Sequence, residues 1–172
     1  MPMADDKTAT VHVGTAPTLE DLLGPEILTT KGIVPTSDAL AGKKRIGMYF
    51  AANWCPPCRT FTPIVSRMYK DLIEADSDIE ILFVSCDGTQ EQFDEYWGSS
   101  MAFPALPYEP RSMKTKLGKQ FDVKFIPTLF FLDATTSKII MRSGVEIIED
   151  GINEDEYFQS VREALGLAAA PP

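Results

Sequence analysis

Two cysteines separated by two prolines form the part of the sequence best suited to chemistry. They are Cys55 and Cys58, within residues 54–59, which read WCPPCR. A dithiol at this spacing closes into a small disulfide ring and opens again, and it supports thiolate attack on other disulfides. We therefore predict the reaction centre here.

The surrounding residues give the two sulfurs different roles. A short apolar strand begins at Arg45, and a helix follows the cysteines, so Cys55 lies where that helix begins. The free N–H groups and the dipole of a helix N-terminus favour a thiolate, which makes Cys55 the predicted attacking sulfur. Cys58, one turn in and less exposed, is predicted to resolve the mixed disulfide.

The two prolines limit how strongly the thiolate is stabilised. Pro57 suits the first turn of a helix. Because Pro56 and Pro57 have no N–H, the first amide able to reach the Cys55 sulfur is that of Cys58. No histidine adds a positive charge between the cysteines. We therefore expect a reductant with a potential of about −270 mV rather than a strong oxidase at about −120 mV. An isomerase or oxidase is disfavoured.

A zinc site or an inert disulfide is the alternative use of the pair. Zinc needs four ligands, and the chain offers only Cys86 and His12 besides the two cysteines, so we expect no metal. Closing so small a loop would stabilise little. His12 is expected to be a solvated strand residue. Cys86 is expected to be a small buried hydrophobe, or, if exposed, a regulatory or dimerising thiol.

Composition restricts the class of protein. The chain has 172 residues, 44% of them hydrophobic, which fits one domain over 1–172. The net charge of −9 disfavours nucleic acid and anionic membranes, and favours basic patches on partner proteins. Three cysteines do not make a secreted disulfide framework, and residues 1–10 are no secretory signal. We expect a cytoplasmic monomer.

The elements that position the dithiol follow from hydrophobic periodicity. Residues 79–86 are a nearly continuous apolar run, expected to form a central strand covered on both faces. Pro63 is expected to kink the helix after the cysteines. Residues 1–9 and 168–172 are expected to be disordered, and residues 10–43 to form an N-terminal extension with short strands. The other predicted elements are strands at 10–13, 27–30, 32–35, 125–133 and 138–142, helical turns at 18–23 and 37–40, an irregular loop at 103–107, and helices at 60–73, 90–97, 112–121 and 154–165.

This order predicts an α/β fold. Strand, helix and strand around the dithiol give a right-handed crossover and a parallel half-sheet. The later hairpin adds an antiparallel half. The result is a central mixed sheet flanked by helices, with an N-terminal extension and β-hairpin.

Several motifs together resemble the thioredoxin fold, and more closely its tryparedoxin and nucleoredoxin branch. The resemblance covers about residues 44–150 and implies a thioredoxin-like fold. The segments that carry it are AANWCPPCR at 51–59, FTP at 61–63, VSCD at 84–87, FP at 103–104 and IPTL at 126–129.

The resemblance implies that Pro127 is a cis proline against the dithiol, leaving the Ile126 backbone free to pair with an extended substrate. An ordinary trans proline at a strand start is the alternative. Trp54 is expected to form a flat apolar lid beside the sulfur and to offer a face to partners, rather than to lie in the core. Arg59 either steers carboxylates of a glutathione-like reductant or is solubilising charge.

Tyr49 departs from ordinary thioredoxins, and the segment around Asp87 departs from tryparedoxins. Tyr49 stands where thioredoxins carry a buried acid and tryparedoxins a tyrosine, and it either bonds the Cys58 thiol or a water, or fills core space. Asp87 looks like the acid of the Trp-Asp-Glu segment of tryparedoxins, although Cys86 replaces that tryptophan. It either ends a strand in a turn or takes part in proton transfer or substrate contact.

The function implied by the resemblance is a protein-disulfide reductase of tryparedoxin type. The resemblance implies trypanothione, or glutathione, as co-substrate and 2-Cys peroxiredoxins as recipients, in peroxide detoxification. No cofactor is expected besides the Cys55–Cys58 redox couple. A nucleoredoxin or thioredoxin recycled by a flavoenzyme, and a redox-gated binding module, are the alternatives.

Overall fold

The computed structural model describes residues 17–151 and 157–167. The strand predicted at 10–13, His12 and the predicted disordered ends lie outside the described residues. So does the beginning of the helix predicted at 154–165.

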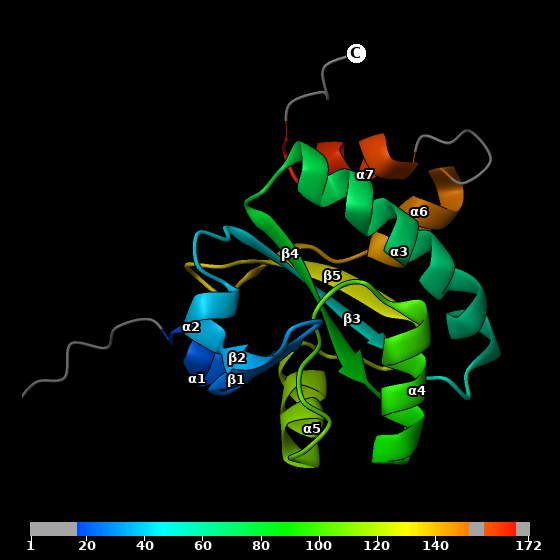
Figure 1. The fold of residues 1–172 in the computed structure, drawn as a ribbon. Helices are drawn as coiled ribbons and strands as arrows, with labels where there is room; N and C mark the ends of the chain where they lie inside the picture. Colours follow the sequence, from blue (N-terminus) through cyan, green and yellow to red (C-terminus); the bar gives the residue numbers. More distant parts are fainter. Residues whose placement is uncertain (1–16, 152–156, 168–172) are drawn as a thin grey trace, which may run out of the picture.

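A four-stranded mixed sheet forms the centre of the molecule (Figure 1), in the order β4-β3-β5-β6. β3 pairs parallel to β4 and antiparallel to β5, and β5 pairs antiparallel to β6. The predicted mixed sheet is therefore confirmed. Its strands are β3 Arg45–Ala51, β4 Ile79–Ser85, β5 Thr128–Asp133 and β6 Ile139–Met141.

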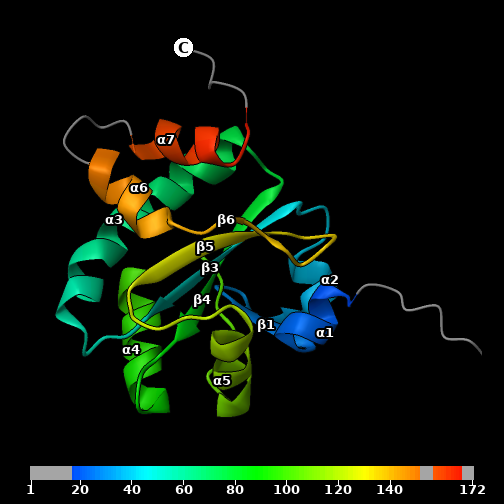
Figure 2. The same cartoon turned by 180° about the vertical axis from the view of Figure 1, so that it is seen from behind.

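Helices cover both faces of the sheet (Figures 1 and 2). Side chains of α3, α4, α6 and α7 share one buried cluster with one face, and those of α1, α2 and α5 share another with the opposite face. The helices are α1 Leu19–Leu23, α2 Thr36–Ala39, α3 Pro56–Ala75, α4 Gln90–Ser100, α5 Arg111–Gln120, α6 Gly144–Gly151 and α7 Tyr157–Ala164. In the described part of the chain, no helix has the length and apolar character needed to cross a membrane.

β3 is buried on both sides because its side chains alternate between the two clusters. Tyr49 and Ala51 join the α3 side, whereas Met48 and Phe50 join the α5 side. The strand therefore holds the following turn, with its two cysteines, on a rigid base. α3 begins directly after that turn and continues through Pro63.

The prediction that residues 79–86 form a central strand is wrong in one respect. Every residue of β4 is buried, as expected, but β4 is the outermost strand of the four-stranded sheet. Its outer edge is covered by the proline-rich segment 104–106. Phe83 donates its N–H to the Pro104 carbonyl at 2.9 Å, and its own carbonyl accepts from Leu106 at 2.9 Å. This covering explains why an edge strand can be apolar throughout.

The N-terminal extension packs beside that segment. β1 Glu26–Thr29 and β2 Gly32–Pro35 form the predicted hairpin. Leu28 and Ala105 exchange two backbone hydrogen bonds of 2.8 and 2.9 Å, which fix the hairpin to the main body. Thr18 caps α1 through a capping box with Asp21, as the sequence indicates for a helix start at this threonine.

Two later elements differ from the prediction. β5 begins at Thr128 rather than at Phe125, so residues 125–127 precede the sheet. The helix α6 was not predicted. It places Ile148 in the core on the α3 side.

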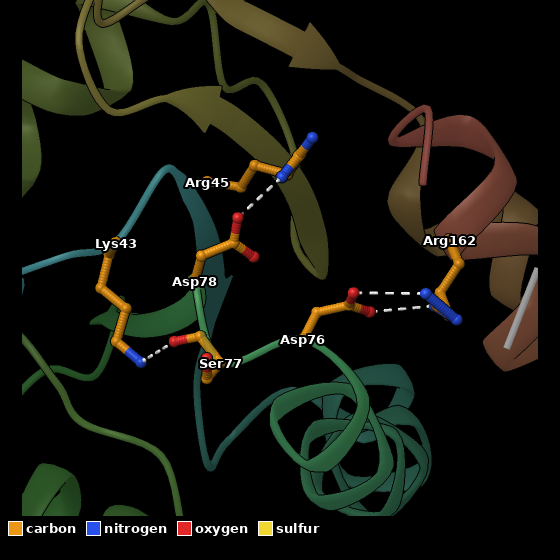
Figure 3. Close-up of polar contacts among 6 residues, drawn as sticks. All are labelled: Lys43, Arg45, Asp76, Ser77, Asp78 and Arg162. Carbon is orange, nitrogen blue, oxygen red and sulfur yellow. Dashed lines mark hydrogen bonds and ion pairs between the residues drawn. The ribbon is translucent and has the colours of Figure 1, made fainter. Parts of the chain in front are cut away.

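Ionic contacts brace the turn between α3 and β4, at the end of β4 where the strand begins (Figure 3). Arg162 of α7 makes two hydrogen bonds to Asp76, of 2.9 and 3.2 Å, and both side chains are largely buried. Arg45 pairs with Asp78 at 3.2 Å. Because the strands β3 and β4 are parallel, this brace lies at the opposite end of the sheet from the cysteines.

Candidate active site

Cys55 occupies the N-cap position of α3, as predicted. Its sulfur accepts a hydrogen bond from the backbone N–H of Cys58 at 3.3 Å, which is the first amide after the two prolines. Cys55 is 4% exposed, whereas Cys58 is completely buried. All three cysteines of the chain carry free thiols in this structure. Of the two residues of the motif, only Cys55 has any surface open to a substrate.

The electrostatics of Cys58 separate it further from Cys55. Burial is the main cause that raises the pKa of the Cys58 thiol to about 12, and the hydrogen bond with the Cys55 sulfur adds to it. The backbone of Ala52 opposes this shift. Cys58 therefore remains a thiol at neutral pH until the Cys55 sulfur is engaged elsewhere. This order is the one that an attacking and a resolving cysteine require.

Three buried hydroxyl groups lie beneath the dithiol. Tyr49 and Thr62 are hydrogen-bonded at 2.8 Å, and Thr62 is also bonded to Tyr96. Burial raises the pKa of Tyr49 far above its ordinary value and that of Tyr96 to about 12. Both phenols are thus neutral and unsuited to act as bases. The ring of Tyr49 packs against Phe61, which fits the predicted packing role, and its hydroxyl is hydrogen-bonded to Thr62 rather than to the Cys58 thiol.

Asp87 is buried and braces the turn that carries the cysteines. One carboxylate oxygen accepts the backbone N–H of Asn53 at 2.7 Å, and the other accepts the Ser85 hydroxyl at 2.7 Å. The Tyr108 hydroxyl donates to the Asp87 carbonyl at 3.1 Å, and Arg111 donates to the Ser85 carbonyl at 2.8 Å. These bonds tie the residue two before Cys55 to the end of β4. These contacts support the prediction that Asp87 ends a strand in a turn. A role of Asp87 in proton transfer or substrate contact stays a prediction.

Trp54 lies on the surface beside the dithiol, with 59% of its area exposed, so it is not a core tryptophan. Its indole N–H donates to the Cys86 carbonyl at 3.1 Å, which fixes the ring over that residue. Cys86 is half-buried, between the two expectations for it. Burial raises the pKa of its thiol, and Lys114 and Arg111 oppose that shift.

The Ile126–Pro127 peptide bond is cis, as the resemblance implies. Ile126 precedes β5, and its backbone groups have no hydrogen-bond partner within the described chain. Arg59 and the two active-site prolines are exposed. Within residues 17–151 and 157–167 Arg59 has no ion-pair partner, so its two predicted roles stay open.

Sequence reasoning missed the polar residues that support the site. Thr62, Ser85, Tyr96, Tyr108 and Arg111 come from four different parts of the chain, and they meet only because the fold brings those parts together. The one available signal was Thr62, a polar residue on the otherwise apolar face of α3.

The geometry agrees with comparisons to known proteins. The sequence model of the family described as "Thioredoxin-like" matches residues 42–139. Tryparedoxin of Trypanosoma brucei brucei is 38% identical over 130 residues, which cover 75% of this chain and 88% of that protein. The chain belongs to the thioredoxin-like family, in its tryparedoxin and nucleoredoxin branch.

The relatives of this thioredoxin-like chain include nucleoredoxins as well as tryparedoxins. Nucleoredoxin of Mus musculus is 36% identical over 137 residues, covering 80% of this chain but only 31% of that protein. The chain thus spans about a third of the length of nucleoredoxin. A solved structure titled "tryparedoxin II complexed with glutathionylspermidine" has a TM-score of 0.68 and 32% identity, covering 77% of this chain and 90% of that one. The thioredoxin-like fold is therefore established.

Proposed function

We propose that this thioredoxin-like protein reduces disulfides in partner proteins, using electrons from a low-molecular-weight dithiol. The observation that carries the proposal is the asymmetry of the two sulfurs. Cys55 lies at the N-terminus of α3 with part of its surface open, and Cys58 is buried with a raised pKa. The Cys55 sulfur is therefore placed to react with a substrate, whereas the Cys58 sulfur is placed to react only with Cys55.

The reaction then runs in two displacements. The Cys55 thiolate attacks one sulfur of the partner disulfide, that S–S bond breaks, and the other partner sulfur leaves as a thiolate that takes up a proton. Cys58 loses its proton and attacks the Cys55 sulfur of the mixed disulfide. The partner leaves as a dithiol, and the Cys55–Cys58 disulfide holds the two oxidising equivalents. An external dithiol restores the reduced protein by the same two steps in reverse order.

Docking of the partner is proposed to use the residues around Cys55. The free N–H and C=O groups of Ile126 accept an extended segment as an added strand, next to Pro127. The exposed face of Trp54 covers apolar parts of the partner. This arrangement holds the partner disulfide near Cys55.

Trypanothione is our proposed electron donor, with glutathione as the weaker one, and 2-Cys peroxiredoxins are the proposed recipients, so that the protein serves peroxide detoxification. The complex of tryparedoxin II with glutathionylspermidine supports a donor of this class. A reducing cytoplasm suits the free, half-buried thiol of Cys86. The nucleoredoxin relatives support the alternative of a protein recycled by a flavoenzyme reductase, or a redox-gated binding module.

The rate at which different reductants recycle the oxidised protein distinguishes the proposed function from its two alternatives. Trypanothione, glutathione, and a thioredoxin reductase with NADPH are supplied side by side, and the rate at which the Cys55–Cys58 disulfide is reduced is followed with insulin or a 2-Cys peroxiredoxin as final acceptor. We expect the fastest recycling by trypanothione. Faster recycling by the reductase would instead indicate a nucleoredoxin or thioredoxin that is recycled by a flavoenzyme. A stoichiometric complex that persists in the Cys55→Ser variant would indicate the binding module.

A further inference from the structure

A basic groove lies beside the dithiol, and its lysines have no part in the mechanism above. It has a volume of about 600 Å³ and lies between α5 and residues 122–126. Its lining includes Trp54, Lys114, Lys119 and Phe125. Phe125 is 66% exposed and Trp54 59%, so two large apolar rings face solvent at a groove that begins next to Cys55.

The charge of this region is opposite to that of the protein. Residues 111–124 contain five basic residues and one acid, whereas the whole chain carries a net charge of −9. Arg111 and Lys116 donate to backbone carbonyls, and Lys124 faces Asp122 at 3.5 Å. The two remaining basic residues of the segment, Lys114 and Lys119, are therefore available to bind a ligand.

Lys114 and Lys119 line the groove, and neither ammonium group has a hydrogen-bond or ion-pair partner within the described residues. Five residues of α-helix separate them by about 7.5 Å along the axis of α5. In an extended chain, side chains two residues apart on one face are separated by about 6.8 Å. Although the two lysines differ by about 140° around the helix axis, both line the same groove, and their long flexible side chains let the ammonium groups reach carboxylates at alternate positions of a strand-like segment.

We propose that this groove binds an acidic, extended segment that flanks the disulfide of a protein partner. The proposal rests on the proposed reductase function and adds a substrate class to it. Lys114 and Lys119 pair with carboxylates of the segment, while Trp54 and Phe125 cover its apolar side chains. Because the rest of the surface is acidic, it repels such a segment, and the local positive potential orients the partner toward Cys55.

The kinetic test uses three peptides with the same internal disulfide, flanked by Glu-Ala-Glu, Gln-Ala-Gln or Lys-Ala-Lys. We expect the kcat/KM of the wild-type protein to be about tenfold higher for the Glu peptide than for the Gln peptide. The double variant Lys114→Glu/Lys119→Glu loses this preference. The variant Lys70→Glu/Lys138→Glu is the matched control, since it changes the net charge equally at exposed lysines away from the groove. High salt removes the preference of the wild-type protein.

A binding measurement keeps the groove and the reductase function separate. Fluorescently labelled peptides in which serine replaces both cysteines are titrated with the Cys55→Ser/Cys58→Ser protein, and anisotropy reports binding. Tighter binding of the Glu peptide, lost on reversal of the two groove lysines, supports the groove even if the wild-type protein reduces none of the disulfide peptides. Binding of this kind without any reduction would refute the proposed reductase function but not the groove.

Two results would overturn the groove proposal. One is equal binding of the three peptides, or a Glu preference that survives in Lys114→Glu/Lys119→Glu. The other is that Lys114→Glu/Lys119→Glu raises the KM for glutathione disulfide about tenfold while the preference for the Glu peptide stays intact. The groove would then be a site for a small carboxylate-bearing thiol rather than for a protein segment.

Discussion

Alkylation of the reduced protein by iodoacetamide at pH 8 should modify Cys55 long before Cys58. Iodoacetamide reacts with thiolates, and the pKa of Cys58 is raised to about 12 from an ordinary value of 9.0. At pH 8, about one Cys58 in ten thousand is therefore a thiolate, compared with about one in ten for an ordinary exposed cysteine. Cys58 should therefore react about a thousandfold more slowly than an ordinary exposed cysteine, before its complete burial is considered.

Peptide mass spectrometry after timed quenching gives the rate at each cysteine. Cys86 is distinguished by its own peptide, and it should react more slowly than an exposed thiol because burial raises its pKa. In denaturant the three cysteines should react at similar rates, which is the control for intrinsic reactivity. A Cys58 rate within tenfold of the Cys55 rate in the folded protein would refute the assignment of the two roles.

Three further substitutions test buried polar contacts, one beneath the dithiol and two at the opposite end of the sheet. Tyr49→Phe should cost about 1 kcal/mol in urea unfolding and leave turnover within twofold, since Thr62 keeps Tyr96 as a partner; several-fold slower disulfide release at intact stability would instead show a polar role. Glu80→Gln should raise the melting temperature at pH 7.5, because burial raises the pKa of Glu80 and its stabilising contribution is lost as pH rises through that value; the difference from wild type should vanish near pH 4, and a gain that persists there would contradict this cause. Arg162→Ala should cost about 3 kcal/mol in urea unfolding by leaving the largely buried Asp76 carboxylate unpaired; a loss below 1 kcal/mol would contradict it.

The site core could be predicted from the sequence because its determinants are local. The position of Cys55 at the start of α3, and the first available amide at Cys58, follow from two prolines and the strand before them. Hydrophobic periodicity likewise predicted the hairpin and most helices. These features depend on neighbours within a few residues, which the sequence displays directly.

The remaining features depend on contacts between distant segments. The apolar run at residues 79–86 led to the wrong prediction of a central strand. Burial by residues 104–106 and burial by a neighbouring strand give the same apolar pattern. The helix α6 was missed because it is short and has a glycine at each end. The brace around Asp87 joins Asn53 and Ser85, and no local pattern predicts that pairing.

Trapping of the mixed disulfide tests the central claim most directly. The variants Cys55→Ser and Cys58→Ser are each incubated with a disulfide-bearing partner protein, and covalent adducts are identified by intact mass under non-reducing conditions. Cys58→Ser should accumulate a one-to-one adduct through Cys55, released by dithiothreitol, whereas Cys55→Ser should form no adduct and no longer turn over. An adduct through Cys58 in the Cys55→Ser variant, or turnover that survives that substitution, would contradict the role of Cys55 as the attacking sulfur.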